Sequence, residues 1–72
     1  MTNQEKISII EEIMELDEGT LDETSVLEEY EEWDSLSKLA LMAEVKKRFG
    51  KKLTQEEIRQ FVIVLDVCNY ME

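Results

Sequence analysis

The chain contains no histidine and no proline, and it has only two glycines and one cysteine among 72 residues. Without histidine, the most common general base for activating a nucleophile is missing, which argues against a stand-alone enzyme. A single cysteine, Cys68, excludes an intrachain disulfide, and we interpret it as a small core residue instead of a reactive thiol. No apolar run approaches the roughly 20 residues of a membrane helix, and the polar N-terminus does not resemble a signal peptide. We therefore expect a cytoplasmic protein that does not bind membranes.

Basic residues are also few, at 8 against 18 acidic ones, which gives a formal net charge of −10. Binding to a nucleic acid backbone needs Lys and Arg, so we expect no nucleic acid partner. Residues 1–34 hold 13 acids and one base (−12), whereas residues 35–72 hold 5 acids and 7 bases (+2). The net charge of −10 favours docking onto basic protein surfaces. Residues 1–72 are expected to form one domain, too small for a deep catalytic cleft.

Four stretches carry apolar residues at helical spacing, which predicts an all-α bundle of three longer helices and one short helix. The longer helices are expected over residues 3–16, 35–49 and 64–71, and the short one follows Thr54. Residues 61–65 are apolar enough for a buried strand, but the chain offers no second strand to pair with it. We therefore expect no sheet.

The apolar stripes of the longer helices define the expected core. In the second helix the stripe repeats every three or four residues, and we expect it to pack against the first and last helices. The predicted core residues are Leu39, Met42, Val45 and Phe49, facing Ile7, Ile10, Met14, Val67 and Met71.

Residues 17–34 form an acidic connection that is long for a compact domain, and long connections are often functional. Apolar residues such as Leu21 and Leu27 are scattered through it, which indicates that it is held across the core. Ser25 and Glu28 have the spacing of a capping box, so a short helical turn after Ser25 is expected.

Where this connection meets the second helix, Trp33, Asp34, Ser35 and Leu36 follow one another. Asp34 or Ser35 suits the N-cap, because either side chain can accept a free backbone N–H. The alternative for Ser35 is covalent modification, since an exposed hydroxyl is accessible and the helix dipole stabilises an attached phosphodiester. Trp33 is either a hydrophobic lid or a contact to the attached group or a partner.

The segment WDSLSKLALMAEVKKRFG, residues 33–50, resembles the Asp-Ser-Leu segment and second helix of acyl carrier and peptidyl carrier proteins. The resemblance covers almost the whole chain, because LTQEEI and VLDVCNYM also follow the order and spacing of that family. It implies that Ser35 carries 4′-phosphopantetheine, installed from coenzyme A by a phosphopantetheinyl transferase that recognises Asp34 and Leu36. The terminal thiol would hold an acyl, aminoacyl or peptidyl group as a thioester, and the protein itself would not be an enzyme.

The resemblance also implies a monomer that docks on an acyl- or aminoacyl-loading enzyme and on downstream synthase enzymes. The predicted docking residues are Trp33, Ala40, Ala43 and Lys47. Many fatty-acid carriers expose an acidic face on this helix, whereas the face expected here is apolar and basic: Ser37, Lys38, Ala40, Ala43, Lys46 and Lys47. This departure favours a specialised polyketide, nonribosomal peptide or aminoacyl pathway over housekeeping fatty acid biosynthesis. The alternative is a carrier-like fold that acts as a protein-interaction module, with Ser35 unmodified.

Overall fold

The computed structural model describes all residues, 1–72, and it is all-α, as predicted. It contains three longer helices, one short helix and one 3₁₀ turn, and no strands. In chain order these are α1 (Asn3–Ile13), η1 (Leu27–Glu29), α2 (Ser35–Phe49), α3 (Gln55–Gln60) and α4 (Val64–Tyr70). None of the helices has the length and apolar character needed to cross a membrane.

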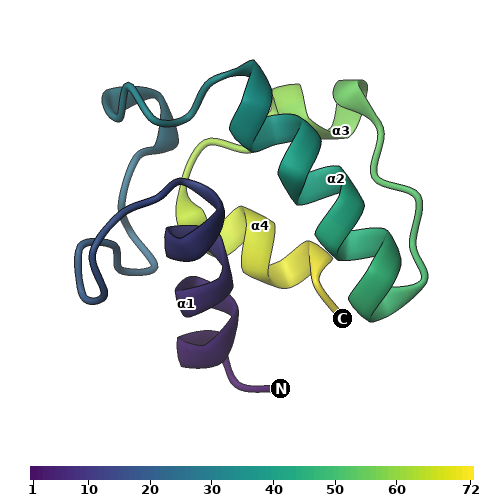
Figure 1. Ribbon diagram of the computed structural model, residues 1–72, viewed down its shortest axis with the longest axis horizontal. Helices are drawn as coiled ribbons and strands as arrows, with labels where there is room; N and C mark the ends of the chain where they lie inside the picture. Colours follow the sequence, from purple (N-terminus) through teal and green to yellow (C-terminus); the bar gives the residue numbers. More distant parts are fainter.

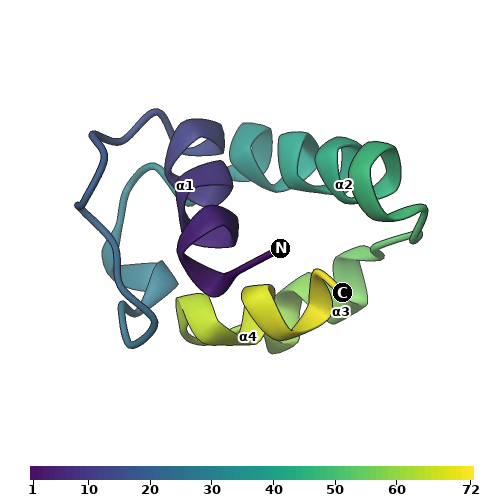
Figure 2. The ribbon, with the colours of Figure 1, turned by 90° about the horizontal axis from the view of Figure 1, so that it is seen from below.

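The helices form two layers. Figure 2 shows α1 and α2 side by side in one layer and α4 with α3 in the other. The connection between α1 and α2 runs around one side of the molecule, on the left in Figure 1, before it reaches the start of α2. The start of α2 therefore lies at one edge of the molecule, close to both the end of the acidic connection and the short helix α3 (Figure 1).

Local interactions set the bounds of α1. The Thr2 hydroxyl accepts the Glu5 N–H at 3.2 Å, and the Glu5 carboxylate accepts the Thr2 N–H at 2.9 Å, which is a capping box. The helix ends at Ile13, earlier than the predicted residue 16, because Glu15 adopts a left-handed backbone with φ of 58°. A right-handed helix cannot continue through that conformation.

α2 has the predicted bounds, but its core-facing side differs from the prediction. Leu39 was expected in the core and is 55% exposed, whereas Leu41 and Val45 are fully buried. Ser37, expected on the outer face, is buried as well. Buried positions four residues apart form one line along a helix, and Leu39 lies about 200° around the axis from Leu41. Both expectations were therefore wrong for the same reason.

Of the other predicted core residues, six are buried, as predicted, and two are only partly buried. Met42 and Phe49 pack against the edge of the core. Cys68 is completely buried, and this burial raises the pKa of its thiol, as expected for a structural cysteine. The buried residues predicted from the sequence are Ile7, Ile10, Met14, Val45, Val67 and Met71.

The connection between α1 and α2 is held across the core, as predicted. Leu21 and Leu27 are buried, and the Leu27 N–H donates to the Val62 carbonyl at 3.0 Å. The expected helical turn exists as η1, but Ser25 does not cap it. The Ser25 hydroxyl instead accepts the Asp22 N–H at 2.9 Å, which closes a tighter turn upstream.

Candidate functional site

Hydrogen bonds at the junction between the connection and α2 position the Asp-Ser-Leu segment. Asp34 is the N-cap of α2, and its Oδ1 accepts the Ser37 N–H at 2.9 Å. The Ser37 hydroxyl donates to the Glu32 carbonyl at 2.5 Å and is buried beneath the junction. These two bonds hold the chain on both sides of Ser35 in one conformation.

Ser35 itself is the first residue of α2, and it is exposed. Its hydroxyl forms no hydrogen bond with any other residue, because Asp34 already supplies the cap. Capping therefore does not explain Ser35. The hydroxyl lies at the N-terminal end of a 15-residue helix, where unpaired N–H groups and the helix dipole favour an anion.

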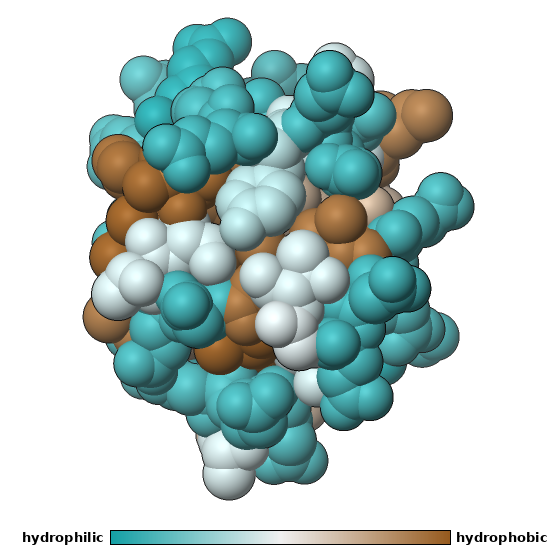
Figure 3. Space-filling view, turned by 90° about the vertical axis from the view of Figure 1, so that its left-hand side faces the viewer, coloured by the Kyte–Doolittle hydropathy of each residue, from teal (hydrophilic) through white to brown (hydrophobic).

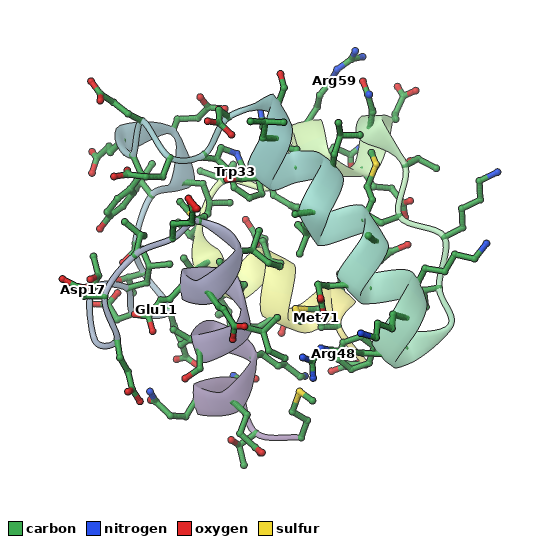
Figure 4. All side chains as sticks on the ribbon, viewed as in Figure 1. Glu11, Asp17, Trp33, Arg48, Arg59 and Met71 are labelled. Carbon is green, nitrogen blue, oxygen red and sulfur yellow. The ribbon has the colours of Figure 1, made fainter.

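Ser35 borders a groove of about 210 Å³ between α2 and α3. Besides Ser35, its lining consists of three apolar residues, Leu39, Met42 and Ile58, two cations, Lys38 and Arg59, and the polar Gln55. Figure 4 shows Arg59 projecting from α3 beside the first turns of α2. An anion attached at Ser35 would therefore have two cationic side chains next to it and an apolar surface along which to lie.

The predicted docking residues do not share one surface. Trp33 is only 6% exposed and closes the junction as a hydrophobic lid, with the Lys38 ammonium 5.6 Å from its ring centroid. Lys47, by contrast, is exposed on α2. Leu36, which was predicted as a recognition residue for the transferase, is 77% exposed. Ala40 is half-buried and Ala43 exposed, and both line a second groove, between α1 and α2.

Sequence reasoning missed part of the surface around Ser35. Lys38 was expected on the exposed face of the helix, whereas Leu39 was assigned to the core. Leu39 follows Ser35 by four residues, which places it on the same side of α2, and that spacing could have identified it. Arg59 has no such signal, because it comes from a different helix and borders the same groove as Ser35 only in the folded chain.

Two buried charged residues on α1 were also missed. The Glu11 carboxylate is 2% exposed and accepts the N–H groups of Gly19 at 3.0 Å and Leu21 at 2.8 Å. The Lys6 ammonium is also buried and donates to the Cys68 carbonyl at 3.2 Å. The available signal for Glu11 was its position four residues after Ile7, on the buried side of the helix.

The surface formed by the acidic connection is largely hydrophilic. Figure 3 shows this side, with hydrophilic side chains surrounding smaller hydrophobic areas. Glu28, Glu29, Glu31 and Glu32 are all exposed along it. No group of three or more acidic, histidine or cysteine side chains is arranged to hold a metal ion.

The chain matches no family model, no curated protein and no solved structure in the comparisons made with each. The function must therefore be inferred from the residues around Ser35 and from their chemistry.

Proposed function

We propose that the protein is an acyl, aminoacyl or peptidyl carrier that bears 4′-phosphopantetheine on Ser35. The observation that carries the proposal is the exposed Ser35 hydroxyl, which is free of hydrogen bonds because Asp34 caps α2. The resemblance of residues 33–50 to carrier proteins supplies the chemistry. A residue that neither caps the helix nor packs in the core is available for modification.

The attachment is a phosphoryl transfer from coenzyme A. The Ser35 oxygen attacks the phosphorus that bears pantetheine, forming a new P–O bond as the pyrophosphate bond breaks. Adenosine 3′,5′-bisphosphate leaves, and the hydroxyl proton passes to a base of the phosphopantetheinyl transferase. The carrier contributes the nucleophile and its position, with Asp34 and Leu36 on either side as recognition residues.

The groove between α2 and α3 supports a role for this arm. The new phosphodiester would lie at the N-terminus of α2, near Lys38 and Arg59. Leu39 is exposed and Met42 partly exposed beside the groove, and they offer apolar surface to the rest of the arm or to its cargo, above the buried Ile58. Under this proposal, the exposed Leu39 contacts the arm or its cargo. If Leu39 were purely structural, burying it would stabilise the fold more than leaving it exposed.

A carrier of this kind catalyses no step, so it needs no histidine or other general base. Its partners would be the transferase, a loading enzyme and downstream synthase enzymes. The outward side of α2 is apolar and basic, with Leu36, Leu39, Lys46 and Lys47 exposed. This character favours a partner with an apolar or acidic site, and hence a specialised biosynthetic pathway.

The test is intact mass after incubation of the apo protein with coenzyme A and a promiscuous phosphopantetheinyl transferase. We expect the mass of one phosphopantetheine to be added, and Ser35→Ala to abolish the gain. Ser8→Ala is the matched control, because Ser8 is also a helical serine whose side chain makes no hydrogen bond. Modification of the Ser35→Ala variant would contradict the site. An unmodified native protein would favour the interaction module instead.

A further inference from the structure

A second groove runs along the other flank of α2, away from the groove that Ser35 borders. It has a volume of about 760 Å³ and lies between α1 and α2, which share one layer (Figure 2). Its apolar lining consists of Ile9, Ile13, Met14, Leu36, Ala40 and Ala43. The two alanines leave room on the α2 side, so the backbone of another helix can come close there.

The rim of this groove is acidic. Five acids line it, and four of them form no ion pair: Glu12, Glu15, Glu32 and Asp34. The fifth, Glu44, is paired with a cation. The one cation in the lining, Arg48, is already bound to Glu44, with Nε and Oε2 2.6 Å apart. The groove therefore joins an apolar floor to acidic side chains that form no ion pair, one of which, Asp34, also caps α2.

Glu15 adds an independent feature to this rim. It has φ of 58°, a conformation that glycine adopts freely and that strains other residues. A glycine here would end α1 with less strain, but it would remove a carboxylate from the rim. Retaining a strained side chain is typical of functional positions.

We propose that the groove between α1 and α2 binds a basic amphipathic helix of a partner protein. Its apolar side would lie on Ile13, Ala40 and Ala43, and its Lys or Arg residues would face the rim acids. A second copy of this chain is a poor occupant, because two molecules of net charge −10 repel each other. The site needs no group on Ser35, so its binding can be tested on a protein that cannot be modified there.

The test uses a synthetic amphipathic peptide of leucine and lysine, with a scrambled peptide of the same composition as control. Binding is measured by fluorescence anisotropy on the Ser35→Ala protein, so that failure of the carrier proposal cannot affect the result. We expect Glu12→Gln/Glu15→Gln to weaken binding about fivefold, since exposed charge pairs are individually modest. Glu28→Gln/Glu29→Gln removes the same charge outside the groove and should change the dissociation constant less than twofold.

A bulky substitution tests whether the peptide occupies the groove itself, apart from the charge of its rim. Ala43→Trp should fill the groove and weaken binding at least as much as the loss of two rim acids. Asn69→Trp, at an exposed position of α4, should leave it unchanged. In NMR spectra, the backbone amides whose chemical shifts change most when the peptide is added should belong to α1 and α2. Equal weakening by both double glutamine variants, equal binding of the scrambled peptide, or salt-sensitive dimerisation without peptide would each overturn the proposal.

Discussion

The Glu11 carboxylate accepts the backbone N–H of Leu21 at 2.8 Å, which ties the middle of α1 to the connection that leads to Ser35. The same oxygen, Oε2, accepts the Gly19 N–H at 3.0 Å, while Oε1 is buried without a partner. A buried acceptor for two backbone N–H groups removes the penalty of leaving them unpaired. Glu11 therefore determines where the connection leaves α1.

Replacing Glu11 with alanine should destabilise the protein by about 3 kcal/mol, because two N–H groups lose a charged acceptor. Glu11→Gln should lose clearly less, since the amide oxygen can take the place of Oε2. Urea unfolding followed by circular dichroism measures both. Equal losses in the two variants would mean that the negative charge, and not the acceptor oxygen, is what matters.

Two leucines on α2 provide a matched pair for the core. Leu41→Ala should destabilise the protein by about 2–5 kcal/mol, because it opens a cavity among fully buried side chains. Leu39→Ala should change the stability by less than about 1 kcal/mol, because the side chain is 55% exposed. Thermal unfolding distinguishes them. A larger loss for Leu39→Ala than for Leu41→Ala would contradict the orientation of α2.

Asp66 stabilises the start of α4 in a pH-dependent way. The backbone N–H groups of Ile63 and Val62, at 3.0 and 2.9 Å, hold the pKa of Asp66 below its usual value of 3.8. A depressed folded-state pKa means that the stabilisation is present above the unfolded pKa and is lost as the pH falls through the folded pKa. Asp66→Ala should therefore destabilise by about 1 kcal/mol near neutral pH, and the difference should shrink in acid.

The measurement is the stability difference between the native protein and Asp66→Ala at neutral pH and at successively lower pH values below 3.8. Other carboxylates titrate in both proteins, so their contributions cancel in the difference. Asn69→Ala, at an exposed position of the same helix, is the control and should show no such trend. A difference for Asp66→Ala that does not change with pH would rule out the carboxylate as the cap.

Glu15→Gly should raise the stability by about 1 kcal/mol, because glycine relieves the left-handed strain at φ of 58°. The same change should weaken binding of the basic peptide to the groove between α1 and α2. Glu15→Gln is the matched control, since it weakens binding but keeps the strain. A glycine variant that is less stable than the native protein would show that the Glu15 side chain contributes more to folding than its backbone strain removes.

The sequence alone determined the features that depend on residues close together in the chain. The bounds of α2 follow from the Asp34 cap and from the left-handed Gly50. α3 begins at a capping box in which the Thr54 hydroxyl accepts the Glu57 N–H at 3.2 Å. Such bonds span three or four residues, so sequence spacing is enough to predict them.

Which side of α2 faces the core was decided by the tertiary structure. Leu39 and Leu41 are both apolar, and helical periodicity permits either one to face inward. The contacts of α2 with α1, together with the α4 residues in the same core, select Leu41. The early end of α1 also escaped prediction, because Glu15 is not a residue that usually adopts a left-handed backbone.

The candidate site, too, was predictable from the sequence only in part. Ser35 could be identified from the sequence, because Asp34, the helix start and the following apolar pattern are its immediate neighbours. Only the folded chain showed that Asp34 alone caps the helix, and that Lys38 and Leu39 share a groove with Arg59. Lys38 and Leu39 of α2 and Arg59 of α3 border this groove from two different helices, and the spacing of residues along a single helix carries no information about how two helices are placed.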